Sequence, residues 1–420
     1  MPSKQEPQPK QSLPISLKWK YIAAPIDVPE QIDVPEQHGD FKIHNSSKTI
    51  KGAFRTFGAS VRGLLHKHEG THCDDWFEIG TAGDWTIIAV ADGAGSKKFS
   101  RIGAKESCKT AVEELKKSLE FLQLTDLEVE SDWQNACNPN DGNIITARDA
   151  VTRAFVLSCN KLQKYANDSA NQEKFNELLG RKFIIDDLAC TLNIAIHYPS
   201  EWGSVIIGCQ IGDGLIGIVM PDGQSKVLSE SDSGGYAGET KFLVSEGMCK
   251  DDVLLPRTEI FFADSIRALL VMTDGVSNDF FPDNGSPTRL WAELLVNGIP
   301  DVGIDQSNTY SNPNIDQDKY SKNREVVEKE PRTSVLIRSA SEYSHALPIS
   351  VEELVAIPEK AWFAHGGAKI EGCPNPHNNS DGDGDRLRLW LDAFYKKGGS
   401  KDDRSLVVLH PVVLHQEVKP

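Results

Sequence analysis

The chain has 420 residues and a formal net charge of −16 at pH 7, because 61 acidic side chains outnumber 45 basic ones. This charge argues against a protein that binds nucleic acid through a general basic surface. Hydrophobic residues make up 39% of the chain and charged residues 25%, as in ordinary globular proteins, and no apolar run is long enough to span a membrane.

Residues 1–50 are rich in Pro and Gln, and the hexapeptide IDVPEQ occurs twice in succession, at 26–31 and 32–37. Proline in both copies disfavours a helix or a central strand, so we expect an extended N-terminal tail. The remaining segment, 51–415, is long enough for one large domain. Within it, residues 283–395 contain a long polar stretch, which predicts an insertion.

Six segments rich in β-branched and apolar residues predict strands at 85–91, 191–197, 204–211, 215–220, 268–273 and 405–410. The third and fourth flank Gly212-Asp213-Gly214, a sequence typical of a β-hairpin. Apolar residues at helical spacing predict helices at 103–123, 146–163, 351–363 and 385–396. Thr146 is the expected N-cap of the second. Because strands and helices do not alternate strictly, the predicted fold class is α+β rather than a doubly wound sheet.

The eight cysteines are widely and irregularly spaced, and several lie inside apolar runs. No C-x-x-C pair occurs, and the first 20 residues lack the apolar core of a secretory signal. We therefore expect a cytoplasmic protein with reduced, buried thiols.

Acidic residues stand repeatedly where apolar strands begin or end. Asp92 and Asp274 each follow a predicted strand and precede a glycine, while the pairs Asp74-Asp75 and Asp402-Asp403 precede apolar segments. A lone Asp-Gly most often marks a turn, but several carboxylates on one rim cannot all stay ionised without a cation. Mg²⁺ or Mn²⁺, which prefer oxygen ligands, would neutralise them and could activate water.

These segments, in this order, resemble the metal-dependent protein phosphatases of the protein phosphatase 2C family. The matching segments are Cys73-Asp74-Asp75-Trp76-Phe77, Val90-Ala91-Asp92-Gly93, Ser100-Arg101-Ile102-Gly103-Ala104, Asp187-Leu188-Ala189-Cys190-Thr191-Leu192, Gly212-Asp213, Thr273-Asp274-Gly275 and Asp402-Asp403. The segment Gly235-Tyr236-Ala237-Gly238-Glu239-Thr240 is similar to a flap of the bacterial branch. The resemblance implies a central β-sandwich of two antiparallel sheets flanked by helices.

The resemblance also implies two metal ions, Mn²⁺ or Mg²⁺, and assigns their ligands. Asp92 would bridge both ions, the Gly93 carbonyl would bind one, and Asp274 and Asp402 would bind the other. Asp75 would hold a metal-bound water, and Asp74 would lie behind it.

Three further assignments follow from the same resemblance. Asp187 is a candidate ligand of a third ion. Asp213 is expected to fix the turn rather than to bind metal. The implied activity is hydrolysis of phosphoserine and phosphothreonine in proteins by a metal-activated water, with a cognate serine/threonine kinase as a partner. The acidic charge, by contrast, is the reason to expect no binding to nucleic acid or membranes.

Two positions depart from the family pattern. Gly70 stands where many members carry a phosphate-binding Arg, and Ala94 stands where some carry a His proposed as a general acid. Arg62, His66 and Lys67 are the candidate replacements for phosphate binding, and His66 is the candidate for protonating the leaving group. The same departures support an alternative function, a weakly active or inactive phosphatase-fold module that binds a phosphoprotein or regulatory partner.

Overall fold

The computed structural model describes residues 41–48, 54–124, 142–200, 203–220, 224–228, 232, 240–280, 287–296, 299–300, 382–393 and 400–411. Several predictions fall outside these residues: the duplicated hexapeptide, the helix at 351–363, the flap segment 235–239 and most of the polar insertion.

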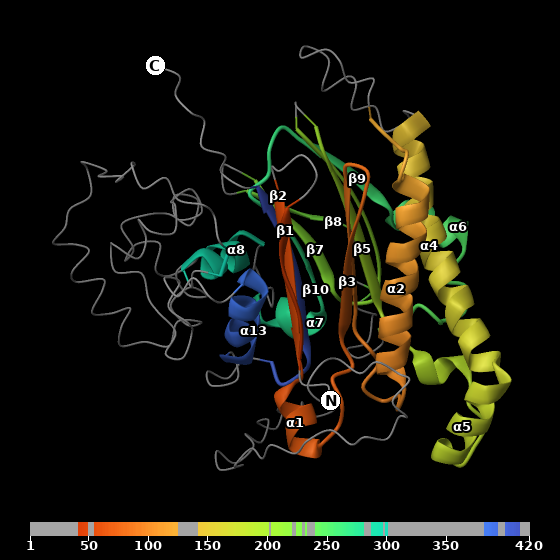
Figure 1. The fold of residues 1–420 in the computed structure, drawn as a ribbon. Coiled ribbons are helices and arrows are strands. Elements are labelled where there is room, and N and C mark those ends of the chain that lie inside the picture. Colours follow the sequence, from red (N-terminus) through yellow and green to blue (C-terminus); the bar gives the residue numbers. More distant parts are fainter. Residues whose placement is uncertain are drawn as a thin grey trace, which may run out of the picture.

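Two antiparallel sheets form the centre of the protein (Figure 1). The six-stranded sheet has the order β1 (Phe41–Lys48), β2 (Phe54–Val61), β11 (Arg404–Pro411), β10 (Ala268–Met272), β7 (Leu215–Val219) and β8 (Ser225–Leu228). The five-stranded sheet has the order β3 (Trp76–Ala82), β4 (Trp85–Ala91), β5 (Leu192–Pro199), β6 (Ser204–Ile211) and β9 (Glu259–Ala263).

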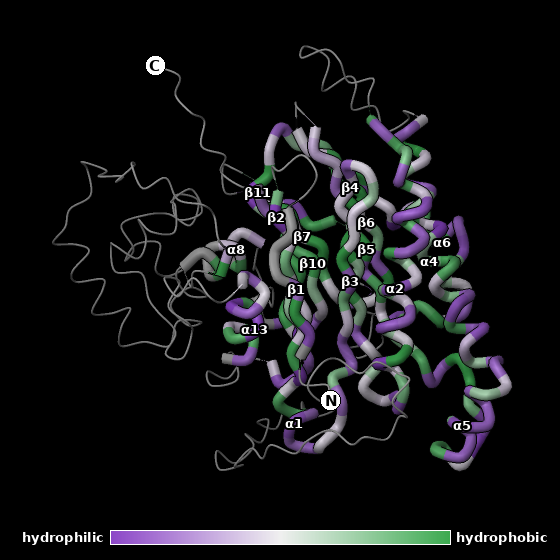
Figure 2. The backbone as a smooth tube through the Cα atoms, in the orientation of Figure 1, coloured by the Kyte–Doolittle hydropathy of each residue, from purple (hydrophilic) through white to green (hydrophobic). Residues whose placement is uncertain are grey.

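Helices cover the outer face of each sheet. The five-stranded sheet packs against α2 (Ser100–Leu119) and α4 (Gly142–Asn167), and the six-stranded sheet against α8 (Pro287–Val296) and α13 (Asp383–Ala393). The remaining helices are α1 (Leu64–Glu69), α5 (Ser169–Leu179), the 3₁₀ turn η2 (Ile185–Leu188), α6 (Asp251–Arg257) and α7 (Asp274–Phe280). Figure 2 shows hydrophobic strands at the centre and hydrophilic stretches along the outer helices.

Strand β4 shows why the apolar runs become central strands. Its side chains alternate between the faces of the sheet. Ile87 and Ala89 join the core under the helices, whereas Ile88 and Val90 join the core between the sheets. A strand buried on both faces must be apolar throughout, which is the pattern that the sequence shows.

The predicted α+β sandwich is confirmed, and all six predicted strands exist within two residues of their expected ends. The hairpin around Gly212-Asp213-Gly214 is wrong: β6 belongs to the five-stranded sheet and β7 to the six-stranded one, so this turn crosses between sheets. Gly212 has φ 112° and lies against Thr191, where a side chain would not fit.

The N-cap assignment of Thr146 is also wrong. Helix α4 begins at Gly142, and the Thr146 hydroxyl donates to the Gly142 carbonyl from inside the first turns. Two elements lie in ranges that were expected to be irregular. Strand β1 lies in the predicted tail, and α8 lies in the predicted polar insertion. In the described part of the chain, no helix is long and apolar enough to cross a membrane.

Candidate metal centre

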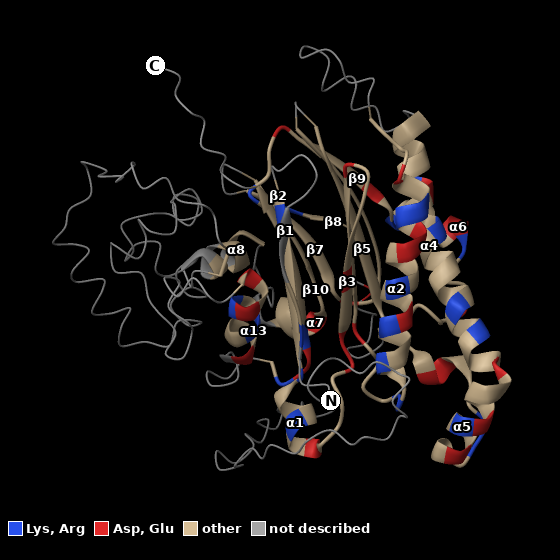
Figure 3. Ribbon diagram, in the orientation of Figure 1, with Lys and Arg blue, Asp and Glu red and all other residues tan. Residues whose placement is uncertain are grey.

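The strand pairing brings the acidic segments to one end of the sandwich. Asp75 precedes β3 and Asp92 follows β4, and the residues next to them, Trp76 and Ala91, are paired across the two strands. In the other sheet, β10 ends just before Asp274. The end of β10 pairs with the starts of β7 and β11, just after Asp213 and Asp402. Figure 3 shows acidic segments where the strands end below β3.

Three of these acids form a candidate metal site, which we call the Asp92 group. Asp92, Asp213 and Asp274 each offer a carboxylate oxygen, and these oxygens all lie within 4.8 Å of one another. Asp213 was expected to be structural, so its place beside two predicted ligands differs from that expectation. A hairpin within one sheet would not place Asp213 there, whereas the turn that crosses between the sheets does.

The carboxylates of the Asp92 group raise one another's pKa. Burial raises the pKa of Asp92 well above its ordinary value, and the charges of Asp75, Asp274, Asp402 and Asp213 raise it further. Burial and two neighbouring carboxylates raise the pKa of Asp274 to about 7. The pKa of Asp402 is raised too, by burial and then by its neighbour in the chain. Divalent cations would relieve this repulsion.

Unpartnered oxygens provide a separate test of fit. Asp213 Oδ2 accepts a hydrogen bond from the Thr240 hydroxyl (2.7 Å), but its buried Oδ1 has no hydrogen-bond partner in the described part of the chain. Asp75 is similar, with Oδ2 accepting from the Thr273 hydroxyl (2.8 Å) and a buried Oδ1 that lacks a partner among the described residues. Buried carboxylate oxygens without donors fit a hard cation.

The backbone around Asp92 and Gly93 is fixed by neighbouring segments. Asp92 N donates to the Thr191 hydroxyl (2.9 Å), Thr191 N donates to the Asp92 carbonyl (2.7 Å), and Gly93 N donates to the Asp74 carbonyl (3.1 Å). A side chain on Gly93 would lie 2.7 Å from that same carbonyl and 2.9 Å from Ser100. Glycine is therefore the residue that fits here.

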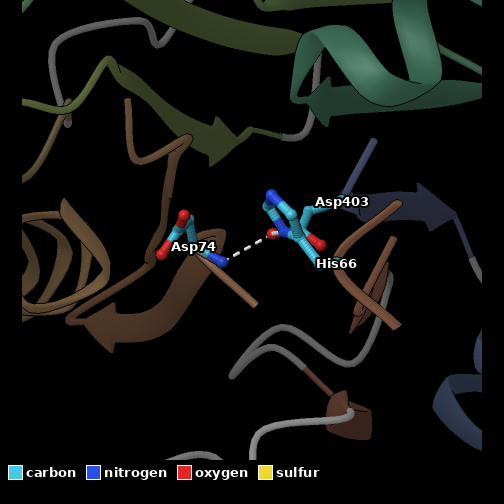
Figure 4. A group of neighbouring side chains, drawn as sticks. All are labelled: His66, Asp74 and Asp403. Atoms are coloured by element: carbon cyan, nitrogen blue, oxygen red, sulfur yellow. Dashed lines mark hydrogen bonds and ion pairs between the residues drawn. The ribbon is translucent and has the colours of Figure 1, made fainter. Parts of the chain in front are cut away.

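A second cluster, the Asp403 group, lies beside these acids and comprises His66, Asp74 and Asp403 (Figure 4). Asp403 Oδ2 accepts a hydrogen bond from Asp74 N (2.5 Å) and forms an ion pair with His66 Nδ1 (2.9 Å). The other oxygen, Oδ1, accepts a hydrogen bond from Gly63 N. One buried carboxylate thus joins the start of α1, the segment that carries Asp75 and the segment that carries Asp402. Sequence reasoning identified the Asp402-Asp403 motif but missed this bridging role.

Charges in the Asp403 group offset one another. Burial alone would lower the pKa of His66, but its ion pair with Asp403 outweighs burial and raises that pKa to about 10. Burial and the charge of Asp403 raise the pKa of Asp74 to about 8. The imidazole thus provides the positive charge for this acidic pair.

The predicted substrate-binding residues have partners inside the protein. Arg62 is fully buried and its Nη2 donates to the His66 carbonyl (3.5 Å), and its contact with a substrate stays a prediction. Lys67 Nζ pairs with Asp392 on α13 (2.6 Å). His66 is buried against Asp403, so its proposed contact with a leaving group stays a prediction.

Asp187, the candidate ligand of a third ion, is held by an arginine. Arg181 donates to both of its carboxylate oxygens, at 2.8 and 2.5 Å, and Ile184 N donates to one of them (3.0 Å). These hydrogen bonds lower the pKa of the buried carboxyl against the opposing effect of burial. Both of its oxygens accept hydrogen bonds in this structure, and its role as a ligand of a third ion stays a prediction.

The fold is an α+β sandwich, and at one end it gathers carboxylates that could hold a metal ion. The sequence profile of protein phosphatase 2C matches residues 62–299, more than half of the chain. The chain therefore belongs to the protein phosphatase 2C family. No curated protein matches the sequence.

Solved structures with a similar fold share little sequence. An S. agalactiae serine/threonine phosphatase is 10% identical, with 85% of this chain and 99% of that chain covered and a TM-score of 0.39. A serine/threonine phosphatase from Staphylococcus aureus is 12% identical over 87% and 96% of the two chains, with a TM-score of 0.37. The catalytic domain of a serine/threonine protein phosphatase in complex with two manganese ions is 11% identical over 86% and 99%, with a TM-score of 0.33.

Proposed function

We propose that the protein is a Mn²⁺- or Mg²⁺-dependent phosphatase that hydrolyses phosphoserine and phosphothreonine in proteins. The observation that carries the proposal is the Asp92 group, in which three carboxylate oxygens lie within 4.8 Å of one another and one buried oxygen has no partner in the described part of the chain. Such a site is stable at neutral pH when cations balance the charge.

The position of each acidic residue suggests its role in metal binding. Asp92 would be shared by two cations, the Gly93 carbonyl would help to hold one of them, and Asp274 and Asp402 would help to hold the other. Asp213 joins this set because of its place in the Asp92 group. Bound cations would lower the pKa of a water molecule and would stabilise negative charge on the phosphoryl oxygens.

Asp75 would orient the attacking water. Its Oδ1 has no hydrogen-bond partner in the described part of the chain, and its Oδ2 is fixed by Thr273. The substrate would be a protein phosphorylated by a serine/threonine kinase, and the compartment the cytoplasm.

The test measures hydrolysis of p-nitrophenyl phosphate and of a panel of phosphoserine and phosphothreonine peptides during a Mn²⁺ titration. Asp92→Asn should lower turnover at least ~100-fold at saturating Mn²⁺, because it removes the shared ligand. Asp149→Asn is the matched control, an exposed acid on α4 outside both acidic groups. Full activity of the Asp92 variant would refute the mechanism.

The alternative function, a binding module with little turnover, has one observation in its favour. Gly70 ends α1 with φ 75°, a left-handed conformation that disfavours the Arg found there in many family members. Arg62, its candidate replacement, is buried. Calorimetry separates the functions: Mn²⁺ binding with turnover supports the enzyme, and phosphopeptide binding without turnover supports the module.

A further inference from the structure

Two partly exposed thiols meet where α4 packs against the segment 240–250. Cys249 Sγ lies 3.2 Å from the Leu243 carbonyl oxygen and 3.8 Å from the Phe155 carbonyl oxygen. Phe155 is one helical turn before Cys159, so both lie on the same face of α4. In an α-helix the backbone N of Cys159 bonds the Phe155 carbonyl, so Cys159 and the Cys249 thiol approach the same carbonyl oxygen.

The other free cysteines of the described chain differ in exposure. Cys159 and Cys249 keep part of their surface accessible, whereas Cys73, Cys108, Cys190 and Cys209 are buried. Among the cysteines that the structure describes, this pair is therefore the one that a dissolved oxidant reaches first.

The segment that carries Cys249 also reaches the Asp92 group. Thr240 donates its hydroxyl hydrogen to Asp213 Oδ2 (2.7 Å). Three residues later, Leu243 N donates to the Cys190 carbonyl (2.8 Å), and the Leu243 carbonyl accepts from the Cys249 thiol (3.2 Å). The thiol is thus one of the anchors that hold this segment beside the candidate metal site.

We propose that Cys159 and Cys249 are a site of reversible oxidation, at which a peroxide converts the two thiols to a disulfide and loosens the segment that holds Asp213. The proposed disulfide depends only on the positions of the two thiols. Its proposed effect on metal binding rests on the proposed function.

The reaction balances without further reactants. The Cys159 thiolate attacks hydrogen peroxide, so the O–O bond breaks, a sulfenic acid forms and, after proton uptake, water leaves. The Cys249 sulfur then attacks the sulfenic sulfur, so the S–S bond forms, the S–O bond breaks and a second water leaves. The two sulfurs together give up the two electrons that reduce the peroxide. The nearby Cys249 thiol lowers the pKa of Cys159, which favours Cys159 as the first nucleophile.

Oxidation removes a hydrogen-bond donor. A disulfide sulfur carries no hydrogen, so the buried Leu243 carbonyl loses the hydrogen bond from Cys249. We expect the segment from Thr240 to Leu243 to shift and Mn²⁺ affinity to fall by about 10-fold, in the range found when a residue that supports a metal ligand is lost. A thiol reductant should restore it.

The experiment treats the full chain with hydrogen peroxide and maps disulfides by mass spectrometry under non-reducing conditions. The expected product is a cross-link between the peptides of Cys159 and Cys249, absent from Cys159→Ser and Cys249→Ser. Cys108→Ser is the matched control, because this buried thiol donates to the Trp76 carbonyl instead, and it should keep the cross-link. If a serine variant does not fold, differential alkylation of the wild-type protein before and after oxidation reports the same pairing.

Each result decides one part of the proposal. Absence of the cross-link, or a cross-link of Cys159 to Cys190 instead, would refute the oxidation site. A Cys159–Cys249 cross-link with unchanged Mn²⁺ affinity by calorimetry would refute the coupling. Because mapping needs no turnover, a protein without phosphatase activity would leave the result on the oxidation site unaffected.

Discussion

Replacing Thr273 by valine tests whether the chain positions Asp75 in advance. Thr273 is fully buried between the two sheets' acidic ends. Its hydroxyl donates to Asp75 Oδ2 (2.8 Å) and accepts from Ser405 N (3.0 Å). Valine has almost the same shape but can do neither, so the substitution removes both hydrogen bonds without opening a cavity.

The magnitude follows from the two groups left behind. A buried polar group that loses its partner costs about 1–3 kcal/mol, so the loss at Asp75 and at Ser405 N should lower the free energy of unfolding by about 2–6 kcal/mol. Asp75 Oδ1 has no hydrogen-bond partner in the described chain, so without Thr273 the orientation of the Asp75 carboxylate would also relax. We expect about 10- to 100-fold weaker Mn²⁺ binding, the usual effect of losing a residue that orients a metal-site carboxylate.

The assay combines Mn²⁺ calorimetry with urea unfolding of the metal-free protein. Thr273→Ser is the control, because it keeps the hydroxyl and should bind Mn²⁺ with nearly wild-type affinity while losing about 1 kcal/mol of stability with the methyl group. Wild-type Mn²⁺ affinity in the valine variant, together with the expected loss of stability, would show that this hydrogen bond does not organise the metal site.

Three further predictions concern pH and metal stoichiometry. Burial and neighbouring carboxylates raise the pKa of Asp274 from its ordinary 3.8 to about 7. The folded metal-free protein therefore binds a proton that the unfolded chain releases, and its unfolding free energy should fall between pH 4 and pH 7; Asp274→Asn or saturating Mn²⁺ should flatten this slope in urea titrations. The ion pair with Asp403 raises the pKa of His66 from 6.5 to about 10. The stability difference between wild type and His66→Gln should therefore be complete below pH 6.5 and disappear as pH approaches 10, and a difference that grows with pH would contradict the ion pair. Because Arg181 occupies both oxygens of Asp187, Asp187→Asn should leave the number of Mn²⁺ ions bound unchanged in calorimetry, whereas loss of one ion would establish a third metal site.

The local pattern of apolar residues was sufficient to predict most of the central strands and the long helices. Strands such as β4 are apolar throughout because both faces are buried, and α2 shows its helical spacing because one side packs on the sheet. The elements that were missed have weaker signals. Strand β1 lies at a sheet edge and has a mixed sequence, and α7 has only seven residues.

The site depended on contacts that the sequence does not display. The acids of the Asp92 group could be proposed because each adjoins a strand, but the nearness of Asp213 depends on a turn that changes sheets. The pairing of His66 with Asp403 joins residues 337 apart in sequence, and the burial of Arg62 depends on packing. Spacing along the chain contains no information on such contacts.

The position of β11 has a consequence for how the protein is made. This strand lies between β2 and β10 in the middle of its sheet, yet it comes more than 340 residues after β2 in the chain. A ribosome must therefore synthesise almost the whole described chain before that sheet can close, and the edges of β2 and β10 stay unpaired until then. Pairing across so long a separation is slow, and exposed strand edges invite association with other chains. Chaperone dependence during synthesis, and aggregation of nascent chains stalled before residue 404, are the expected signs of this topology.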